Sequence, residues 1–358
     1  MKKILFYIHS LNKGGAERVL LTLAKKLSKT YEVAILTDVY DEREYPLPDG
    51  IRRIDLQTYM NKVSWIRVGA LKRLVAIRLC CKKEAPDKMI AFMISNAIRA
   101  VLANLLSGNK VITAVRSNPY DDYGSGKKRL FLQTVFFFAD RIVCQTSYQK
   151  EYFNKYLQKK CAVIANPLFS EFCMEPYDGE KDKQIVSAGR LFDYKNHKLL
   201  IQAFAKVAED FPEYQVTILG EGPYRAELEK EIAKLHMESR IFLPGDSDHV
   251  AEDIYKASVF ALPSDTEGMP NALMEAMALG LAVVSTDCPC GGPKSLIRHG
   301  ENGLLCRVGD VEDMAAQLRI VLADDALRVK LGKNAFSIRE DCHIDRISAK
   351  WSQLINEK

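Results

Sequence analysis

Two acidic residues, Glu267 and Glu275, delimit a segment whose composition suggests binding chemistry. The segment, EGMPNALMEAMALG, runs from Glu267 to Gly280 and has the pattern of a loop followed by a helix. Carboxylates accept hydrogen bonds strongly and pair with sugar hydroxyls, and the unpaired N–H groups at a helix N-terminus attract an anion. This combination indicates a phosphate site between two hydroxyl-binding acids, as a nucleotide sugar would need. Taken alone, the spacing fits an ordinary capped helix with two unrelated acids equally well.

A buried strand and a short helix would position these acids. The apolar run VFALP, from Val259 to Pro263, predicts the strand. Asn271 suits the N-cap of the helix and Gly280 suits its C′ position. Glu267 then lies in the loop before the helix, and Glu275 lies just over one turn inside it.

Two cations, Arg190 and Lys195, follow the strand predicted for QIVSAGRL. Both would lie at the carboxyl edge of a parallel sheet, the edge that also carries the Glu267 loop. Arg binds two phosphate oxygens at once and Lys adds a point charge, so the pair predicts a diphosphate clamp. Such a clamp would neutralise the charge that develops on a departing diphosphate. A surface Arg and Lys at a strand–helix corner would show the same spacing.

The 358 residues exceed what one hydrophobic core usually holds, so we expect two domains. The net charge of +5 is divided unequally, because 29 Lys and Arg oppose 14 Asp and Glu through Ser170, whereas 22 oppose 32 beyond it. The resulting +15 of the first half predicts an anionic partner there, either a membrane face or a nucleic acid. Nine cysteines, with no CxxC and no apparent signal peptide, predict reduced thiols in the cytosol.

Strands and helices alternate along the chain, which predicts an α/β fold of two doubly wound, Rossmann-like domains facing each other across a cleft. The alternation begins with a strand over 2–9, a turn at Gly14-Gly15, a helix over 16–28 and the strand YEVAILT. The turn lacks GxGxxG spacing, so it does not predict a dinucleotide site. An acidic segment with Pro and Gly over 171–183 indicates the linker, and the predicted domains are 1–170 and 171–339.

A basic amphipathic segment over 62–83 interleaves Lys and Arg with Trp65 and with aliphatic residues. This pattern is typical of a helix that lies on an anionic membrane surface. A helix that packs its apolar face on the sheet and leaves its lysines in water explains it equally well. A second basic and aromatic cluster, Lys127 to Phe138, extends the same character. No run of about 18 apolar residues is present, so no spanning helix is expected.

Several motifs, in this order, resemble glycosyltransferase family 4. They are GGAE, GRL followed by YKN, GEGP, PSDTEGMPNALMEAMALGLAVVSTDC, GGP and NGLL. The resemblance spans nearly the whole chain, is strongest from Ile185 to Arg307, and is closest to bacterial enzymes that build capsule, O-antigen or other lipid-linked glycans. It implies the GT-B fold, a retaining mechanism and a nucleotide-sugar donor. It also implies that the first domain binds the acceptor and that 340–358 packs back onto it.

The resemblance assigns roles to residues of this chain. Arg190 and Lys195 would hold the donor diphosphate, Glu267 would contact hydroxyls of the transferred sugar, and Glu275 would bind the ribose. Further donor contacts are implied for Gly14, Gly15, Gly220, Glu221, Gly222, Leu243, Gly268, Met269, Pro270 and Asn271.

One position departs from the family pattern. Many relatives carry a histidine after the strand that here ends at Val115, whereas this chain has Arg116-Ser117-Asn118. Arg116 and Asn118 are therefore the candidates for a sugar or acceptor contact, and the role of the histidine does not transfer.

No metal and no other cofactor is expected. Asp246-Ser247-Asp248 mimics the DxD metal motif of the other glycosyltransferase fold, but Arg190 and Lys195 already supply positive charge. No protein nucleophile is named either, because a departing diphosphate can itself assist attack by the acceptor on the same face.

These features predict a retaining glycosyltransferase that moves a hexose or an N-acetylhexosamine, from a UDP-sugar by preference, to a lipid-linked or polysaccharide acceptor. Its expected location is the inner face of the cytoplasmic membrane. A nucleotide-sugar epimerase or hydrolase could use the same site. A dinucleotide-dependent oxidoreductase and a non-catalytic binder of nucleotide or nucleic acid are further alternatives. Nucleic acid is not an expected partner, because motifs for stacking single strands are absent.

Overall fold

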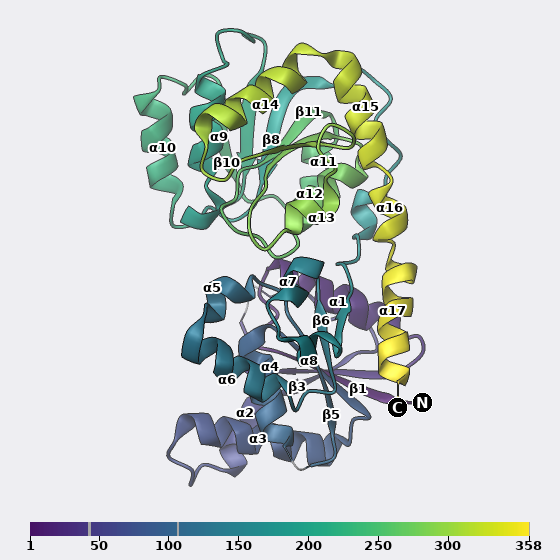
Figure 1. The fold of residues 1–358 in the computed structure, drawn as a ribbon. Helices are drawn as coiled ribbons and strands as arrows, with labels where there is room; N and C mark the ends of the chain where they lie inside the picture. Colours follow the sequence, from purple (N-terminus) through teal and green to yellow (C-terminus); the bar gives the residue numbers. More distant parts are fainter. Residues whose placement is uncertain (42–43, 106, 358) are drawn as a thin grey trace. The chain divides into compact units, whose positions relative to one another are not determined.

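The structure, a computed structural model, describes residues 1–41, 44–105 and 107–357. It divides into two compact units, each built around a parallel sheet (Figure 1). Unit 1 comprises Met1–Pro167 and Ile344–Lys358, and unit 2 comprises Leu168–His343. Each unit is described by itself.

The sheet of unit 1 has seven strands in the order β3-β2-β1-β4-β5-β6-β7, and all its pairings are parallel. The strands are β1 (Lys3–Ile8), β2 (Glu32–Thr37), β3 (Arg52–Asp55), β4 (Lys88–Phe92), β5 (Lys110–Ala114), β6 (Arg141–Cys144) and β7 (Cys161–Val163). The chain proceeds from β1 first to one side and then to the other. A topological switch point therefore lies between the carboxyl ends of β1 and β4.

Helices cover both faces of this sheet, as right-handed crossovers between parallel strands require. They are α1 (Gly15–Leu27), α2 (Leu56–Lys62), α3 (Gly69–Glu84), α4 (Ile94–Asn104), α5 (Pro119–Tyr123), α6 (Gly126–Phe136), α7 (Ser147–Glu151) and α8 (Lys155–Gln158). The C-terminal helix α17 (Ile344–Asn356) also belongs to unit 1 and lies beside α1 (Figure 1). Its Trp351 is fully buried and stacks on Phe92, with ring centroids 6.1 Å apart.

The helix predicted over 62–83 is shorter than expected. It begins at Gly69, and a separate helix, α2, ends at Lys62. Trp65 lies in the loop between them and is 77% exposed. Val63 and Ile66, which flank Trp65, are buried in the core of unit 1.

The sheet of unit 2 has six strands in the order β10-β9-β8-β11-β12-β13, again with parallel pairings. The strands are β8 (Asp182–Ala188), β9 (Gln215–Leu219), β10 (Ile241–Gly245), β11 (Ala257–Leu262), β12 (Ala282–Thr286) and β13 (Leu304–Cys306). The order reverses between β8 and β11, which places a second switch point at their carboxyl ends. β11 and β12 are buried along their full length, as expected for strands covered on both faces.

The helices of unit 2 complete a second doubly wound domain. They are η1 (Ser170–Phe172), η2 (Asp193–Lys195), α9 (His197–Ala205), α10 (Arg225–Lys234), α11 (Val250–Tyr255), α12 (Asn271–Ala278), α13 (Gly292–Leu296), α14 (Val311–Ala323), α15 (Asp325–Ala335) and α16 (Ile338–Asp341). Two Rossmann-like α/β units confirm the predicted fold class. The acceptor-binding and donor-binding roles of these units stay predictions.

Candidate functional site

The switch point of unit 2 brings together the two loops that carry the predicted cations and the predicted sugar-binding acid. One loop follows β8 over 189–196, and the other follows β11 over 263–270. Because β8 and β11 are adjacent parallel strands whose chains leave in opposite directions, their loops diverge and leave room for a ligand. The fold thus positions both loops at the edge where open α/β sheets bind ligands.

Lys195 and Glu267 form an ion pair at this edge, with Lys195 Nζ 2.6 Å from Glu267 Oε1. Their side chains are only 20% and 10% exposed, so water screens the pair weakly. Ser264 Oγ donates to the same Glu267 oxygen at 2.8 Å. Among the described residues none donates to Glu267 Oε2, which is therefore available to accept a hydrogen bond from a substrate hydroxyl.

Hydrogen bonds between the two loops fix the position of Lys195. The backbone N–H of Asp265 donates to the carbonyl of Tyr194 at 2.9 Å, and Asn196 Nδ2 donates to Asp265 Oδ1 at 2.8 Å. Asn196 also has a left-handed backbone, with φ of +45°, and its side chain accepts from the N–H of Leu199 to cap α9. Asn196 therefore ends the loop 189–196, caps α9 and connects this loop to the loop 263–270 by a hydrogen bond.

A third loop holds the backbone of Glu267. The Glu267 N–H donates to the carbonyl of Pro289 at 2.9 Å, and the Cys290 N–H donates back to the Glu267 carbonyl at 3.1 Å. A Cβ at Gly292 would lie 2.2 Å from the carbonyl oxygen of Gly268, so only glycine lets the loops approach this closely. The orientation of the acid thus depends on the loop after β12.

Arg190 lies at the same edge but remains exposed. Its Nη2 donates to the hydroxyl of Tyr194 at 3.2 Å, and its guanidinium lies 5.0 Å from the centroid of Phe192. Within the described part of the chain it forms no ion pair. The Tyr194 ring also lies 5.8 Å from Lys195 Nζ, so one aromatic residue contacts both predicted phosphate ligands.

Helix α12 supplies the second glutamate of the predicted pair. The prediction that Asn271 is the N-cap was wrong: Pro270 occupies the N-cap with an extended backbone, and Asn271 is the first helical residue. Pro fixes φ near −65° and so suits the start of a helix. Gly280, with φ of +71°, stands just past the helix end, where a left-handed residue is needed. Glu275 is 5% exposed, so a ligand would reach it only at the loop edge.

The glycines predicted to line the nucleotide also reach this edge. The Gly220 N–H donates to the Gly245 carbonyl at 2.8 Å, and a Cβ at Gly220 would lie 2.0 Å from the carbonyl oxygen of Gly189. A Cβ at Gly222 would lie 2.3 Å from the carbonyl oxygen of Leu191. The loops after β8, β9 and β10 are therefore packed backbone against backbone.

The side chain of Glu221 is held by Arg225. Arg225 Nη1 donates to Glu221 Oε1 at 2.6 Å, and Arg225 Nη2 donates to the Leu243 carbonyl at 2.6 Å. Arg225 therefore links the two segments that were predicted to flank the base, and sequence reasoning did not identify it.

Burial sets the protonation of two groups beside the ion pair. Burial, and then the charge of Lys195, lower the pKa of His197 to about 3, so this imidazole is neutral near pH 7. Burial, and then the charge of Glu267, raise the pKa of Cys288 to about 12, so this thiol stays protonated. Neither group has the charge state of a nucleophile or general acid at neutral pH.

In unit 1, Gly14 and Gly15 form the start of α1. Gly14 is the N-cap with an extended backbone, and Gly15 is the first helical residue and is exposed. Backbone N–H groups at this N-terminus lie just beyond the carboxyl end of β1, where an anion would be stabilised.

Arg116 is turned into the core of unit 1 and is 9% exposed. Its guanidinium lies 4.4 Å from the ring centroid of Phe92 and 5.6 Å from that of Trp351, and its Nη1 donates to Asn166 Oδ1 at 2.9 Å. Burial lowers the pKa of Arg116 to about 9. Asn118, also buried, accepts from the N–H of Tyr120 and caps α5. Both residues thus have structural contacts, and their predicted contacts with sugar or acceptor stay predictions.

Sequence reasoning missed the groups that orient the acid. Ser264, Pro289 and Cys290 are not among the residues predicted for the site. The signal available was the serine three residues before Glu267, a spacing at which its hydroxyl can contact the carboxylate.

Across the described ranges, no cluster of three or more His, Cys, Asp or Glu has metal-binding geometry. Likewise, within these ranges no helix has the length and hydropathy needed to cross a membrane.

Two family models match the chain, one on each part. Residues 13–169 match Glycosyltransferase Family 4, and residues 175–337 match Glycosyl transferases group 1. The chain is 30% identical to a Campylobacter jejuni GalNAc-alpha-(1->4)-GalNAc-alpha-(1->3)-diNAcBac-PP-undecaprenol alpha-1,4-N-acetyl-D-galactosaminyltransferase, over 100% of this chain and 99% of the relative. It is 29% identical to a second Campylobacter jejuni enzyme, an N-acetylgalactosamine-N,N'-diacetylbacillosaminyl-diphospho-undecaprenol 4-alpha-N-acetylgalactosaminyltransferase, over 95% of each chain.

The fold is similar to that of Anabaena Alr3699/HepE in complex with UDP and glucose, with a TM-score of 0.83 and 17% identity over 99% of each chain.

Proposed function

The chain belongs to the family 4 glycosyltransferases, and from this premise we propose that it transfers an N-acetylhexosamine or hexose from a UDP-sugar to a lipid-linked acceptor, with retention of configuration. The Lys195–Glu267 ion pair at the β8/β11 switch point carries the proposal. In this pair, the cation proposed for the diphosphate and the acid proposed for a sugar hydroxyl are joined by one hydrogen bond of 2.6 Å. Membership of this family makes the protein a glycosyltransferase.

In the proposed complex the donor diphosphate lies against Arg190 and Lys195. Arg190 is exposed and free of acidic partners within the described residues, so it can bind two phosphate oxygens at once. Lys195 would keep its hydrogen bond to Glu267 Oε1 and direct its other N–H groups to the diphosphate. Glu267 Oε2 would accept from a hydroxyl of the transferred sugar, and Glu275 would accept from the ribose hydroxyls.

The proposed chemistry needs no covalent enzyme intermediate. Glu267 is neutralised by Lys195 and by the Ser264 hydroxyl, which makes its carboxylate a weak nucleophile. The acceptor hydroxyl oxygen would form its bond to the anomeric carbon as the bond to the departing phosphate oxygen breaks. The hydroxyl proton would pass to that phosphate oxygen, and UDP would leave with its charge stabilised by both cations.

The choice of donor and acceptor rests on relatives. Two Campylobacter enzymes named above transfer N-acetylgalactosamine to undecaprenol-diphosphate glycans, and they cover nearly the whole chain. A structural neighbour binds UDP. We therefore favour a UDP-N-acetylhexosamine as donor and a polyprenyl-diphosphate glycan as acceptor.

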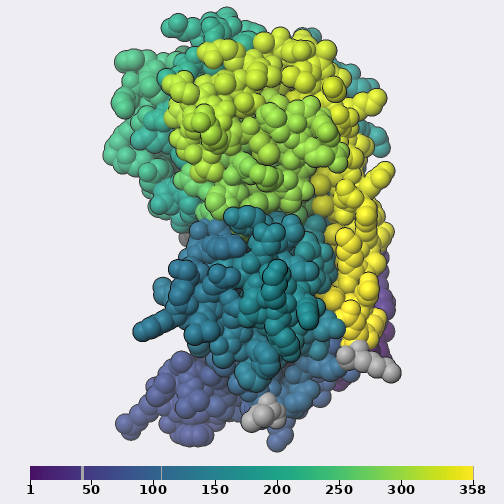
Figure 2. Space-filling model, in the orientation of Figure 1, coloured from purple at the N-terminus to yellow at the C-terminus, as the bar shows by residue number. Residues whose placement is uncertain are grey.

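Unit 1 has an exposed surface that suits a lipid-linked acceptor at an anionic membrane face. Trp65, Val68 and Leu71 are 77%, 64% and 50% exposed, and Lys62 and Arg67 lie between and beside them. We call this segment, residues 62–71, the apolar tip. In Figure 2 the surrounding residues of α2 and α3 form the blue-purple lobe at the lower left. Aromatic and aliphatic side chains flanked by cations suit the membrane interface.

The test is donor turnover across UDP-, GDP- and ADP-sugars, with and without a polyprenyl-diphosphate glycan. Nucleoside-diphosphate release that requires the glycan, prefers one UDP-sugar and disappears in Arg190→Ala, Lys195→Ala would support the proposal. NMR of the product would have to show the anomeric configuration of the donor. Lys198→Ala, which removes a nearby cation paired with Glu231, is the matched control and should retain turnover. Release without acceptor would indicate a hydrolase or epimerase instead.

A further inference from the structure

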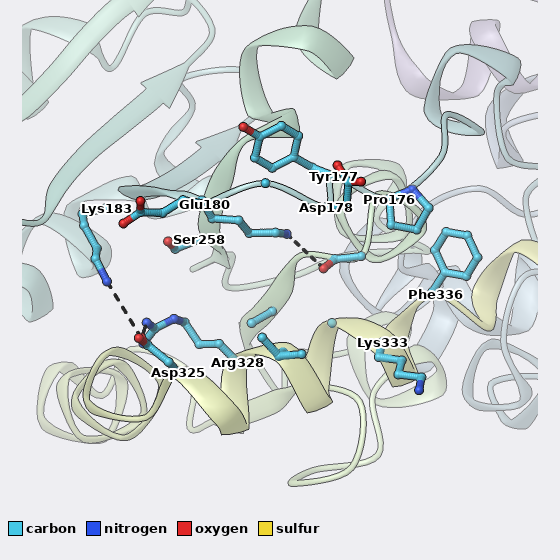
Figure 3. Close-up of a pocket in the computed structure, with 16 residues that line it drawn as sticks. Pro176, Tyr177, Asp178, Glu180, Lys183, Ser258, Asp325, Arg328, Lys333 and Phe336 are labelled. Carbon is cyan, nitrogen blue, oxygen red and sulfur yellow. Dashed lines mark hydrogen bonds and ion pairs between the residues drawn. The ribbon is translucent and has the colours of Figure 1, made fainter.

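A cavity of about 510 Å³ lies on unit 2 and is lined by residues 176–183 and by α15 (Figure 3). Asp182, Ala257 and Ala282 begin β8, β11 and β12, and the cavity opens beside these amino ends. Lys195 and Glu267 follow the carboxyl ends of the same sheet. Because β8 has seven residues at about 3.3 Å each, the two edges are separated by roughly 20 Å. The cavity is therefore not part of the proposed donor site.

The walls of the cavity are held in place by close packing. A Cβ at Gly332 of α15 would lie 2.2 Å from the carbonyl oxygen of Gly280, so the helix rests directly on the turn after α12. On the other side, Tyr177 packs edge-on against Tyr255, whose hydroxyl donates to the Glu175 carbonyl at 2.5 Å. A cavity with such walls is formed before any ligand arrives, as is usual for small-molecule sites of this size.

Lys181 directs a desolvated ammonium into this space. Its Nζ donates to the Gly280 carbonyl at 3.2 Å, its one hydrogen-bond partner among the described residues. An ammonium has three N–H donors, so two remain for a ligand. Burial lowers the pKa of Lys181 to about 8. No ion pair joins Lys181 to a carboxylate among the described residues.

The other charged groups of the lining are already paired or lie at the rim. Lys183 Nζ is 3.9 Å from Asp325 Oδ1, and Arg328 Nη2 pairs with the same carboxylate, as Figure 3 shows for Lys183. Arg328 Nη1 also donates to the carbonyls of Val321 and Leu322, each at 2.7 Å. Asp178, Glu180 and Lys333 are exposed. Of the charged residues that line the cavity, Lys181 is therefore the one whose charge a bound ligand would neutralise.

We propose that this cavity binds a small organic anion, in which a carboxylate or phosphate accepts hydrogen bonds from Lys181 Nζ and an apolar body fills the space between residues 176–183 and α15. An anionic oxygen would satisfy the two remaining donors of the ammonium and compensate its desolvation. Pro176, Val329 and Phe336 offer apolar surface to the body of the ligand (Figure 3). This site is separate from donor binding and would exist whatever sugar the enzyme transfers.

The experiment uses four benzene derivatives that differ in head group. Benzoate and phenyl phosphate are the anionic probes, benzamide is neutral and benzylamine is cationic. Ligand-observed NMR on the full chain, with saturating UDP present, measures their affinities. We expect millimolar binding of both anions, no comparable binding of benzamide or benzylamine, and no displacement by UDP. The better of the two anions would identify the preferred head group.

Three variants assign the binding to Lys181. Lys181→Met, which keeps the length of the side chain, should weaken anion binding about tenfold or more, and Lys181→Arg should restore most of it. Lys183→Met is the matched control, because Lys183 lines the same cavity but already faces Asp325, and it should bind the anions like the parent. Circular dichroism and UDP affinity check that each variant is folded.

Several results would overturn the proposal. They are the failure of both anions to bind at millimolar concentrations, equal binding of benzylamine, displacement of the anions by UDP, or unchanged anion affinity in a folded Lys181→Met variant.

Discussion

Lys195 Nζ lies 2.6 Å from Glu267 Oε1 although 72 residues separate them in the chain. The pair exists because β8 and β11 are neighbours in the sheet, so the loops that follow them meet at one edge. The cation predicted to hold phosphate and the acid predicted to bind sugar are therefore parts of one unit. A change in either residue alters the charge that the other experiences.

We predict that the effects of Lys195→Ala and Glu267→Gln on catalysis are not additive. Each single change should lower kcat/KM by about 100-fold or more, because it removes a charged contact that matters most in the transition state. The double variant should lose less than the product of the two effects, since Lys195→Ala also leaves Glu267 without its counter-ion. The measurement is a double-mutant cycle on kcat/KM for the preferred UDP-sugar, with Lys198→Ala as control. Fully multiplicative losses would show that the two groups act independently.

The position of this pair could be foreseen, but the groups that orient it could not. Strand–helix alternation predicts where β8 and β11 end, and parallel pairing brings Arg190, Lys195 and Glu267 to one edge. The bonds from Ser264 and from the backbone of Pro289 and Cys290 depend on loop conformation, which no periodic pattern encodes. For Arg225, the contact with Glu221 is a local i,i+4 pair, whereas the bond to the Leu243 carbonyl, 18 residues away, depends on the tertiary fold.

Arg116 shows a second limit of sequence reasoning. The resemblance to glycosyltransferase family 4, in which many relatives have a histidine at this point, made Arg116 a candidate for a sugar or acceptor contact, and that contact stays a prediction. In the structure its guanidinium lies 4.4 Å from the ring centroid of Phe92 of β4 and 5.6 Å from that of Trp351 of α17, beside the stack that these two rings form. Arg116, Phe92 and Trp351 come from three segments that are far apart in the sequence. The burial of Arg116 therefore depends on the tertiary fold and has no signal in the local sequence.

Glu275 provides a test of ribose recognition. Its carboxylate is almost fully buried on α12, and as a ribose ligand it should accept from the 2′- and 3′-hydroxyls. Glu275→Gln should therefore weaken UDP binding by roughly 1.5–3 kcal/mol, the usual worth of a hydrogen bond to a charged group. Titration calorimetry with UDP and 2′-deoxy-UDP checks the cause: the parent should prefer UDP, and the variant should lose most of that preference. An unchanged preference would place Glu275 outside the ribose site, whatever its effect on stability.

Trp65 reports directly on membrane contact. The chain has two tryptophans, of which Trp351 is fully buried and Trp65 is 77% exposed. If the apolar tip inserts into anionic vesicles, Trp65 emission should shift to shorter wavelength while that of Trp351 stays constant. Neutral vesicles should give a smaller shift, and salt should reduce it. Trp65→Phe should abolish the shift, which identifies the reporter.

The cations used to test this surface must be chosen from the structure. Reversing the charge of Lys62 and Arg67 should lower sedimentation with anionic vesicles, because both are exposed beside Trp65. Arg78 is unsuitable, since it donates to the carbonyl of Leu105 at 2.8 Å and its loss would disturb the fold. Lys350, exposed on α17, is the control for reversing Lys62 or Arg67 singly, since each of these changes alters the net charge equally, and its reversal should leave sedimentation unchanged. Equal losses for both surfaces would mean that net charge alone governs binding.

His197 should make the stability of the protein depend on pH in a predictable direction. Its pKa is about 3 in the folded chain and about 6.5 in an unfolded one, because burial opposes the charged form. Below about pH 6.5 the unfolded chain therefore binds a proton that the folded chain does not, so the free energy of unfolding falls as pH falls from about 6.5 toward 3. The loss approaches 1.4 kcal/mol per pH unit once the pH is well below 6.5.

The His197→Gln variant lacks this titration. Between pH 6 and pH 5, the free energy of unfolding of the variant should therefore fall by roughly 1 kcal/mol less than that of the parent. Urea unfolding of both proteins at these two pH values measures the difference, in which all shared titrations cancel. Parallel curves for parent and variant would show that His197 is protonated in the folded chain.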